Sequence, residues 1–499
     1  RTSRRPRRGM RQGGNTAAVI GAGPAGLLTA ISLAQRGWDV SVFDSRLAPL
    51  PPDDESWGAG ERSYQIGLNG RGQKALSEFG AMDRVSKYAA SVRGRLNFDA
   101  SGTPTENRLK PPGTPGAEKN YVTRVLQRDR LQACLLEEVQ QVYPQVRVEF
   151  GMGCDGVDLV GERPAVRLCR QPAGMEDDEG CELGSVVEAP SCYDLVVGAD
   201  GVRSSVRASL ADALSSNTRA IRFPDYNERR YKTLPLHPTF GLSDLSWGAR
   251  NQTLDLGMDA LPTMEGEMVA VLLFKPGSVV AEQIGALSSA EEARAFLTAA
   301  LPGLTPYIRD SDLERFVQRP IGRLPSFQLV EGDLHFALPR GGVVLLGDSI
   351  KAVKPYFGQG ANSALEDVSI LNRCLTEQAD DPAATVVAFS SARGDDARAL
   401  VRTSRSFDGR GPLGTARFLL PLLVDIQLNK LLPALFSPPM LRGLQDERNT
   451  FLGLRRRKRA ERMLLAAIMA AVGLVLKLVV QRAWCGACSL SLWPVLRAA

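Results

Sequence analysis

The hydrophobic pattern at the start of the chain predicts a strand, a glycine turn, an amphipathic helix and a second strand. Apolar residues fill positions 17–20, and after Gly26 they recur at helical spacing as far as Leu33. Gly37 ends this helix, and a second apolar run fills positions 40–43. The order strand, helix, strand opens a βαβ unit and therefore predicts a parallel sheet.

Further along the chain the pattern changes. Residues 221–321 form short alternating segments, which indicate an antiparallel sheet, and the chain is mostly helical after Leu365. Two stretches, 103–119 and 171–185, are rich in Pro and Gly or in acidic residues, and we expect them to be expendable loops. A helix and two strands are predicted at residues 129–144, 146–150 and 192–201. The fold class is therefore α/β with an antiparallel-sheet unit inserted.

Composition and charge narrow the class of protein. The 499 residues suffice for two or three domains, and 44% apolar content fills a sizeable core. Much of the net charge of +6 is local, because residues 1–11 hold six arginines and residues 455–462 hold six basic residues. The remaining body is close to neutral, so we expect no nucleic-acid binding. Residues 1–14 are interpreted as a basic leader, either the end of an organelle transit peptide or a disordered basic arm.

An apolar segment near the C-terminus predicts a membrane anchor. Residues 463–480 are apolar or small apart from Lys477, and these eighteen positions just span a thin bilayer if the lysine reaches the interface. The basic cluster before the segment and Trp484 and Trp493 after it favour membrane contact. The basic side is expected in the cytosol. A buried core helix is the alternative.

The cysteines and histidines do not indicate a metal site. The eight cysteines are scattered and mostly lie in apolar runs, which predicts reduced thiols rather than a disulfide framework. Cys485 and Cys488 have thioredoxin-type spacing without its βαβ setting, so lipid attachment or a plain thiol pair is favoured. The chain has two histidines, His237 and His335, and both are expected to be structural.

The glycine turn after the first strand has the fingerprint of dinucleotide binding. Gly21 permits a tight turn, Gly23 lets the backbone approach a pyrophosphate, and Gly26 lets helix and strand pack closely. The helix start offers free N–H groups and a positive dipole end to the anion. Asp44 lies 23 residues after Gly21, at a strand end, where a carboxylate accepts bonds from ribose hydroxyls. A glycine turn that serves packing alone is the alternative.

Two further aspartates at strand ends indicate which dinucleotide binds. Asp200 and Gly201 follow one buried strand, and Asp348 follows the strand at residues 341–347. Both aspartates lie far along the chain from the first glycine turn, so they suit a long ligand that crosses several strands. FAD, with its ribityl chain, is such a ligand.

Three motifs in this order resemble those of the single-component flavoprotein aromatic hydroxylases. They are GAGPAG from Gly21, GADGVRSSVR from Gly198 and GDSIKAVKPYFGQGANSALED from Gly347, and the resemblance covers about residues 17–375. Within that family the chain is most similar to the kynurenine 3-monooxygenases, through the segments at residues 61–80, 91–98, 127–131 and 229–236.

The resemblance implies a domain organisation. The FAD-binding domain, a Rossmann-like domain of the glutathione-reductase type, is expected at residues 15–80, 120–210 and 335–395. The substrate domain is expected at residues 81–119 and 211–334, and a helical region at residues 396–460. The anchor at residues 463–480 follows, and in eukaryotic members such an anchor lies in the mitochondrial outer membrane. A plastid membrane is the second location considered.

The resemblance also implies site residues. The helix opened by GQG is expected to point at the flavin, where N–H groups of its first turn stabilise the negative charge of the reduced ring. Implied catalytic positions are Arg95, which matches the arginine that pairs with a substrate carboxylate, and Pro355 and Phe357 beside the flavin. Implied cofactor-binding positions are Gly21, Gly23, Ala25, Gly26, Phe43, Asp44, Arg46, Gly67, Arg128, Cys154, Asp200, Gly201, Asp348, Gly358, Gly360, Ala361 and Asn362.

The chain departs from the kynurenine 3-monooxygenases around the substrate. The tyrosine that shares the substrate carboxylate falls at about Pro112, and the C-terminal substrate asparagine and tyrosine have no clear counterparts. The usual GDAAH is GDSIK here, so Lys351 replaces a histidine, and GDSI also occurs in plant zeaxanthin epoxidases.

The implied reaction is hydroxylation of an aromatic substrate, with or without a carboxylate, with FAD as cofactor, NADPH as reductant and O2 as co-substrate. Two alternatives stay open at this point. One is an FAD-dependent epoxidase of a lipophilic isoprenoid, and the other is a membrane-anchored FAD-binding subunit without monooxygenase activity.

Overall fold

The computed structural model describes most of the chain: residues 14–55, 57, 64–110, 114, 121–170, 189–214, 218–225, 227–239, 241–355, 358–409 and 411–492. Phe357, Pro112, Trp493 and the predicted loop at residues 171–185 lie outside the described residues. The same holds for residues 1–13 of the predicted leader.

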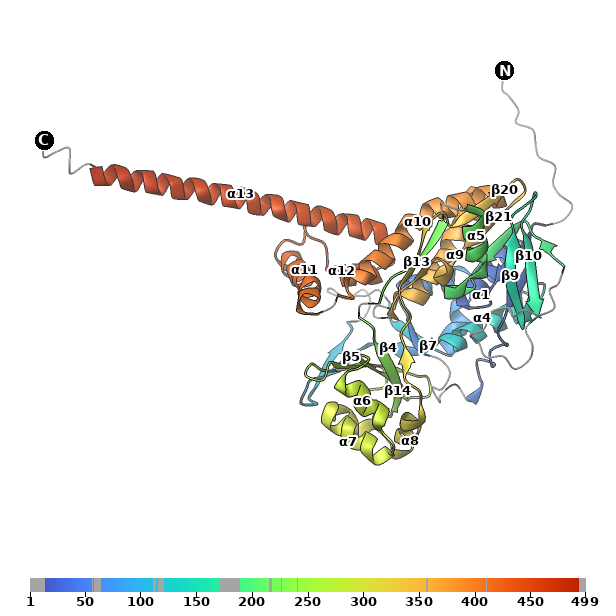
Figure 1. The fold of residues 1–499 in the computed structure, drawn as a ribbon, viewed down its shortest axis with the longest axis horizontal. Coiled ribbons are helices and arrows are strands. Elements are labelled where there is room, and N and C mark those ends of the chain that lie inside the picture. Colours follow the sequence, from blue (N-terminus) through green and yellow to red (C-terminus); the bar gives the residue numbers. More distant parts are fainter. Residues whose placement is uncertain are drawn as a thin grey trace, which may run out of the picture.

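A mainly parallel sheet forms the centre of the molecule (Figure 1). Within the described residues its strand order is β20-β21-β12-β1-β2-β8, and β20 runs antiparallel to β21. The strands are β1 (Thr16–Ile20), β2 (Asp39–Asp44), β8 (Arg147–Phe150), β12 (Leu195–Gly198), β20 (His335–Leu338) and β21 (Gly341–Leu345). The inner strands β1, β12 and β21 are buried almost throughout, as expected for strands covered on both faces.

The predicted βαβ opening is confirmed. Helix α1 (Pro24–Gln35) joins β1 to β2 and begins at Pro24, a residue that suits the first turn of a helix. Its apolar residues share one core with those of α4 (Arg128–Val142), α9 (Gln359–Glu377) and the central strands.

A second sheet has its own hydrophobic core. In the described residues its strand order is β18-β14-β17-β16-β15-β5-β6. Its strands are β5 (Gly94–Phe98), β6 (Pro104–Arg108), β14 (Arg230–Leu236), β15 (Ser246–Asn251), β16 (Leu256–Pro262), β17 (Met268–Phe274) and β18 (Gly322–Arg323). The pairs are antiparallel except β15 with β5, which is parallel. The predicted antiparallel sheet is thus confirmed for β14 to β17.

Two predictions in this part of the chain were wrong. Helices α6 (Val279–Ala286), α7 (Ala290–Ala300) and α8 (Asp310–Gln318) lie within the region predicted to be all sheet, and Ser278 and Ser289 cap the first two. These serine caps were the missed signal. The predicted loop at residues 103–119 contains the edge strand β6, whose residues are all exposed and therefore show no alternating hydrophobic pattern.

Three small sheets connect these parts. They are β3-β7-β4, β11-β10-β9 and β13-β19-β22. Their strands are β3 (Gln65–Leu68), β4 (Ala90–Val92), β7 (Thr123–Gln127), β9 (Met152–Asp158), β10 (Ala165–Arg170), β11 (Ser191–Cys192), β13 (Thr218–Arg222), β19 (Gln328–Gly332) and β22 (Lys351–Ala352). Helices α2 (Gly70–Glu78), α3 (Met82–Lys87) and α5 (Ser205–Leu214) complete this part.

The C-terminal part is helical, as predicted. It comprises α10 (Pro382–Ser406), α11 (Gly411–Leu431), α12 (Met440–Gln445) and α13 (Phe451–Leu492). Helix α13 projects away from the body of the molecule (Figure 1). Its stretch Phe451–Arg482 is long and apolar enough to cross a membrane, and the most apolar window of that stretch is not buried against the rest of the chain.

The cysteines follow the prediction with one exception. Cys134, Cys154, Cys192 and Cys374 are free thiols, whereas Cys169 is disulfide-bonded, contrary to expectation. The side chains of Cys485 and Cys488 lie outside the described residues.

Candidate functional site

The central sheet brings the predicted motifs to one edge. Ile20 of β1 is in register with Phe43 of β2 and with Gly198 of β12. Gly198 is in turn in register with Leu345 of β21. Because these strands are parallel, their C-terminal ends lie together, and this is the edge at which open α/β sheets bind ligands. The segments at this edge carry Gly21, Asp44, Asp200 and Asp348.

The turn after β1 packs directly against the turn after β12. Gly21 has φ +100°, and a Cβ there would lie 2.5 Å from the carbonyl oxygen of Ala199. A Cβ on Gly26 would overlap the carbonyl oxygen of Gly21. Gly23 differs, because a Cβ there would meet only the guanidinium of Arg128, 3.7 Å away. Packing therefore requires Gly21 and Gly26, while the backbone at Gly23 is open to a ligand.

Asp44, at the end of β2, binds the backbone of the turn after β1. Its buried carboxylate accepts a hydrogen bond from the backbone N–H of Ala22 at 2.7 Å. It also accepts one from the backbone N–H of Arg46 at 2.9 Å, and the Arg46 guanidinium lies 3.1 Å from Oδ2. Asp44 thus forms an ion pair with Arg46 and also holds the turn after β1 in place at the edge of the sheet.

Asp200 follows β12 and has one carboxylate oxygen without a partner. Its Oδ2 accepts hydrogen bonds from the backbone N–H groups of Ser205 at 2.8 Å and Val206 at 3.3 Å. Its Oδ1 is buried and has no hydrogen-bond partner among the described residues. Burial raises the pKa of Asp200, although these hydrogen bonds act in the opposite direction. A buried carboxylate oxygen of this kind is suited to accept a ligand hydroxyl.

Cys154, on β9, lies beside the Asp200 turn. Burial raises the pKa of its thiol to about 11. A hydrogen bond with Ser205 lowers this pKa, and the charge of Asp200 raises it. The thiol is therefore protonated at neutral pH and is not a thiolate nucleophile.

Asp348 follows β21 in a short turn, Gly347–Ser349. Its side chain is exposed, yet desolvation by the surrounding protein raises its pKa, against the charges of Arg128 and Lys351. The carboxylate is therefore accessible, while the protein around it disfavours its charged form. Arg128, at the start of α4, therefore lies near both Gly23 and Asp348.

The first turn of α9 faces this edge and is tied to β3. Gly358 caps the helix with φ +60°, a conformation that favours glycine. The side-chain amide of Asn362 donates to the carbonyl oxygens of Gly67 at 2.8 Å and Gly358 at 2.6 Å. A Cβ on Gly360 would meet no atom of the described residues within 4 Å. The helix start is thus rigidly held, and its Gly360 side is open.

A buried ion network supports this helix from behind. Asp367, on α9, accepts from Lys351 Nζ at 2.6 Å, from Arg393 Nε at 2.5 Å and from the backbone N–H of Gly347 at 2.9 Å. Burial alone would raise the pKa of Asp367, but the charges of Arg393 and Lys351 hold it below its usual value. Burial lowers the pKa of Lys351. The network fixes the Asp348 turn relative to α9.

Arg95 lies on β5 in the second sheet and already has partners. Its Nη2 is 2.6 Å from Asp259 Oδ1, and its Nε donates to Asn97 at 2.8 Å. Asp259 also pairs with Arg250, so two guanidinium groups share one carboxylate. The cluster has a net charge of +1, and its side chains are about half exposed.

The other predicted positions are placed as follows. Ala25 lies in the first turn of α1, 3.7 Å from where a Cβ on Gly347 would be, and Gly201 opens a short turn with φ +76°. Pro355 is exposed just before the end of a described segment, and Phe357 lies outside the described residues. His237 contacts Asp312 at 2.6 Å, away from this edge, and the described residues contain no group arranged to hold a metal.

Sequence reasoning missed two residues that hold the edge together. Arg207 donates to the carbonyl oxygens of Ser349 at 3.0 Å and Val202 at 2.7 Å, and so joins the turns after β12 and β21. Asp367 binds Lys351 from within α9. Both lie inside the quoted motifs, as the last residues of GADGVRSSVR and of GQGANSALED, and this position was the available signal.

Comparison with known proteins agrees with this architecture. A family model described as an FAD binding domain matches residues 15–224. Kynurenine 3-monooxygenase of Salinispora arenicola (strain CNS-205) is 30% identical over 429 residues, which cover 84% of this chain and 86% of that protein. The kynurenine 3-monooxygenase of Xanthomonas campestris pv. campestris (strain 8004) is 29% identical over 428 residues, 84% of this chain and 85% of the relative.

Solved structures share the fold at lower identity. A mutant of 2-methyl-3-hydroxypyridine-5-carboxylic acid oxygenase aligns with a TM-score of 0.56 and 20% identity, covering 84% of this chain and 93% of its own. Pseudomonas aeruginosa PqsL in complex with 2-aminobenzoylacetate gives a TM-score of 0.55 and 18% identity, with coverage of 79% and 95%. Klebsiella pneumoniae HpxO complexed with FAD gives 0.53 and 17%, with coverage of 91% and 98%.

Proposed function

The chain belongs to the kynurenine 3-monooxygenase family of FAD-dependent hydroxylases, and on that premise we propose that it uses NADPH and O2 to hydroxylate an aromatic substrate that carries a carboxylate. It is an oxidoreductase of the FAD monooxygenase class. The relatives favour an aromatic hydroxylase over an isoprenoid epoxidase or an inactive FAD-binding subunit.

One observation carries the cofactor assignment: the turns after β1, β12 and β21 and the start of α9 share one edge of the central sheet. An FAD there would have its pyrophosphate at Gly23 and the start of α1, where the Gly23 side is open and no side chain caps the first turn. Ribose hydroxyls would approach Asp44, and Asp200 Oδ1 and Asp348 would accept from hydroxyls further along the molecule. The unpartnered oxygen of Asp200 supports this fit.

The start of α9 is proposed to lie at the isoalloxazine ring. Bound FAD would take a hydride from NADPH and use O2 to supply the oxygen atom. The N–H groups of Gly360 and Ala361 are in the first turn of α9, and the positive end of the helix dipole favours the negative charge of a reduced ring. Asn362 holds this turn in place through its bonds to Gly67 and Gly358.

The substrate carboxylate is proposed to bind near Arg95. Asp259 occupies one side of the Arg95 guanidinium, but Arg250 adds a second positive charge to the cluster. A carboxylate would therefore meet a site with one net positive charge, and a guanidinium offers paired N–H donors to it. The departure at Pro112, outside the described residues, removes the tyrosine hydroxyl expected at this place.

Membrane attachment through α13 is also proposed. The helix is apolar and exposed over residues 463–480, which supports attachment, and the basic cluster before it favours the cytosolic side for the body of the protein. The relatives named above are bacterial and do not bear on an organelle, so the mitochondrial outer membrane and the plastid remain predictions from sequence.

The test of this function is NADPH oxidation by the FAD-loaded protein with and without L-kynurenine, together with mass spectrometry of the product. We expect kynurenine to accelerate NADPH oxidation and to gain one oxygen atom. A panel of other aromatic acids distinguishes a changed substrate from a lost activity. Flavin-loaded protein that neither oxidises NADPH nor oxygenates any member of the panel would show the proposal to be wrong.

A further inference from the structure

A cavity lies at the base of α13, apart from the sheet edge described above. It has a volume of about 330 Å³ and lies between the end of α10, helices α11 and α12, and the first turns of α13. This volume is at the lower end of the range, about 300–1,000 Å³, that is usual for small-molecule sites. Six cationic side chains line it: Arg402, Arg417, Arg455, Lys458, Arg459 and Arg462.

Lys458 serves the structure of the cavity wall. It is buried, and its Nζ lies 2.9 Å from Glu461 Oε2 and 3.3 Å from Asp425 Oδ2. It also donates to the carbonyl oxygen of Ser437 at 2.9 Å. Its charge is thus balanced, and it ties α13 to α11 and to the segment before α12.

Most of the arginines carry charge that the protein does not balance. Arg402 has Glu331 at 3.6 Å, but in the described part of the chain no carboxylate lies within ion-pair distance of Arg417, Arg455, Arg459 or Arg462. Burial lowers the pKa of Arg455, and the charges of Arg402 and Arg459 lower it further. Like charges gathered in a partly enclosed space indicate a site for an anion.

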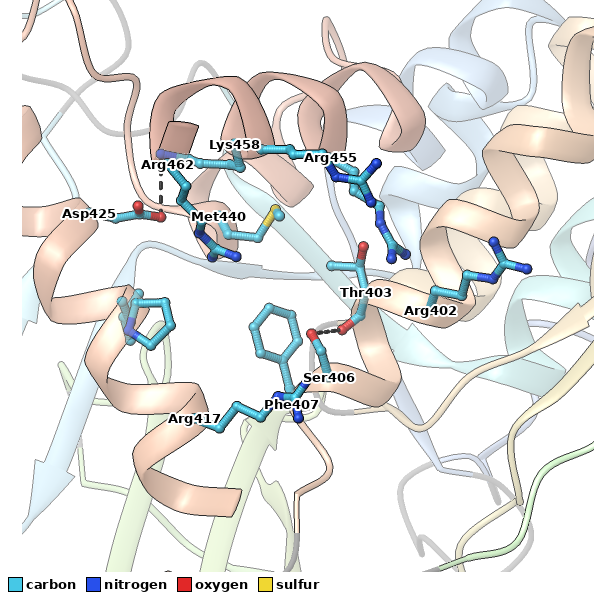
Figure 2. A pocket seen from close by; sticks show the side chains of 13 residues that line it. Arg402, Thr403, Ser406, Phe407, Arg417, Asp425, Met440, Arg455, Lys458 and Arg462 are labelled. Atoms are coloured by element: carbon cyan, nitrogen blue, oxygen red, sulfur yellow. Dashed lines mark hydrogen bonds and ion pairs between the residues drawn. The ribbon is translucent and has the colours of Figure 1, made fainter. Parts of the chain in front are cut away.

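Side chains from two helices converge on this space. In Figure 2, Arg462 extends from α13 into the space above Phe407, Arg455 lies on the side of Thr403, and Arg417 reaches toward Phe407 from α11. The cavity therefore combines guanidinium donors with apolar lining residues, among them Phe407 and Met440. Guanidinium groups bind phosphate oxygens with paired hydrogen bonds.

The end of the cavity nearest Met463 lies at the depth of the headgroup layer of a membrane, whereas Arg455, eight residues before Met463, lies about 12 Å from the start of the apolar stretch. Arg459 and Arg462 precede Met463, where the exposed apolar stretch begins, by four residues and one residue. At about 1.5 Å per residue they lie about 6 Å and about 1.5 Å from its start. The polar layer of one leaflet is about 5–8 Å thick.

Helix α11 adds a second apolar surface beside the cavity. Leu413, Leu420 and Leu423 are each more than half exposed, at 87%, 64% and 54%. Exposed leucines gathered on a helix next to a membrane-spanning segment are suited to the boundary between headgroups and acyl chains.

We propose that this cavity binds the phosphate headgroup of an anionic phospholipid in the membrane that α13 enters, with Arg417, Arg455 and Arg462 as the principal ligands. The inference rests on the proposed membrane attachment and is independent of the hydroxylation chemistry. The acyl chains of the bound lipid would contact the exposed apolar faces of α11 and α13.

The test is native mass spectrometry of the full-length protein in an uncharged detergent, titrated with phosphatidylglycerol or with phosphatidylcholine. We expect one phosphatidylglycerol to bind at least tenfold more tightly than phosphatidylcholine. The double variant R455Q/R462Q is expected to lose at least tenfold in affinity. The matched control R456Q/R457Q removes two exposed charges from the same helix outside the cavity, and we expect it to change affinity less than twofold.

Three results would overturn the proposal: equal binding of the two lipids, equal losses in the two double variants, or displacement of the lipid by inorganic phosphate at equal concentration. The last result would identify free phosphate as the ligand. Flotation with phosphatidylcholine vesicles tests the anchor separately. Protein that floats but shows no preference for phosphatidylglycerol would support the membrane anchor and contradict the proposed lipid site.

Discussion

The ammonium group of Lys351 lies 2.6 Å from Asp367 Oδ2, and both side chains are buried. Lys351 stands where the family motif has a histidine, and Arg393 of α10 binds the same carboxylate. The guanidinium of Arg393 also lies 5.6 Å from the ring of Phe451, at the start of α13. The helix that leaves the body of the protein is therefore packed against the network that supports the proposed flavin site.

Removing the charge of Asp367 is expected to destabilise the fold. In the variant D367N, Lys351 and Arg393 would lose their shared counter-charge, and breaking a buried pair costs about 3–5 kcal/mol. The control D395N removes an exposed carboxylate on α10 that pairs with Arg398, and should cost less than about 1 kcal/mol. Urea denaturation measures both, and equal losses in the two variants would contradict the role given to Asp367.

The contribution of Asp367 should depend on pH in one direction. Its pKa in the folded protein is below the unfolded value of about 3.9. Its stabilisation is therefore fully present above about pH 4 and is lost as the pH falls toward the folded pKa. We expect the difference in unfolding free energy between wild type and D367N to be constant from pH 5 to 7. It should shrink below pH 4 by up to about 1.4 kcal/mol per pH unit. A difference that stays unchanged to pH 3 would refute this assignment.

The variant G360L tests whether a ligand lies against α9. Among the described residues no atom lies within 4 Å of a Cβ on Gly360, and leucine favours a helix over glycine by up to about 1 kcal/mol, so the fold should not suffer. A bound flavin would meet the new side chain, and we expect FAD affinity to fall at least tenfold. The control is G285L in α6, where the surroundings are equally open. Isothermal titration with FAD measures both, and unchanged affinity in G360L would place the flavin elsewhere.

Substitution of Arg95 tests the proposed carboxylate site. R95Q leaves Asp259 with Arg250, so the second sheet should remain folded. Loss of a charged hydrogen bond to the substrate should raise KM about tenfold, with a smaller change in kcat. The control R108Q removes an exposed arginine on the neighbouring strand β6, and steady-state kinetics should not change. If R95Q and R108Q change KM equally, the effect of R95Q comes from the loss of one positive charge and not from a direct contact between Arg95 and the substrate.

The parts of the fold that the sequence predicted are those with strong local patterns. Strands β1, β2 and β12 are continuous apolar runs, and their glycine turns lie where tight packing requires glycine, as at Gly21. Strand β6 was missed because all its residues are exposed. Helices α6 and α7 were missed although Ser278 and Ser289 cap them, and α8 begins without a side-chain cap.

The site was predictable where a motif presents a residue at a strand end, and less so where partners come from distant segments. The pairing of Arg95 with Asp259 joins residues 164 positions apart, and no local pattern indicates it. The bond between Arg207 and Ser349 joins two predicted motifs, yet only the register of β12 with β21 brings them together. Long-range polar contacts of this kind depend on the assembled sheet rather than on local sequence.

The central claim is that the edge formed by β1, β12, β21 and α9 holds one FAD. The most direct measurement is the ratio of flavin to protein in the purified chain after incubation with FAD, read from visible absorbance, for the wild type and for D348N. We predict one FAD per chain in the wild type and a clear loss of bound flavin in D348N. A wild-type protein that takes up no flavin, or a D348N variant that retains it in full, would contradict the account.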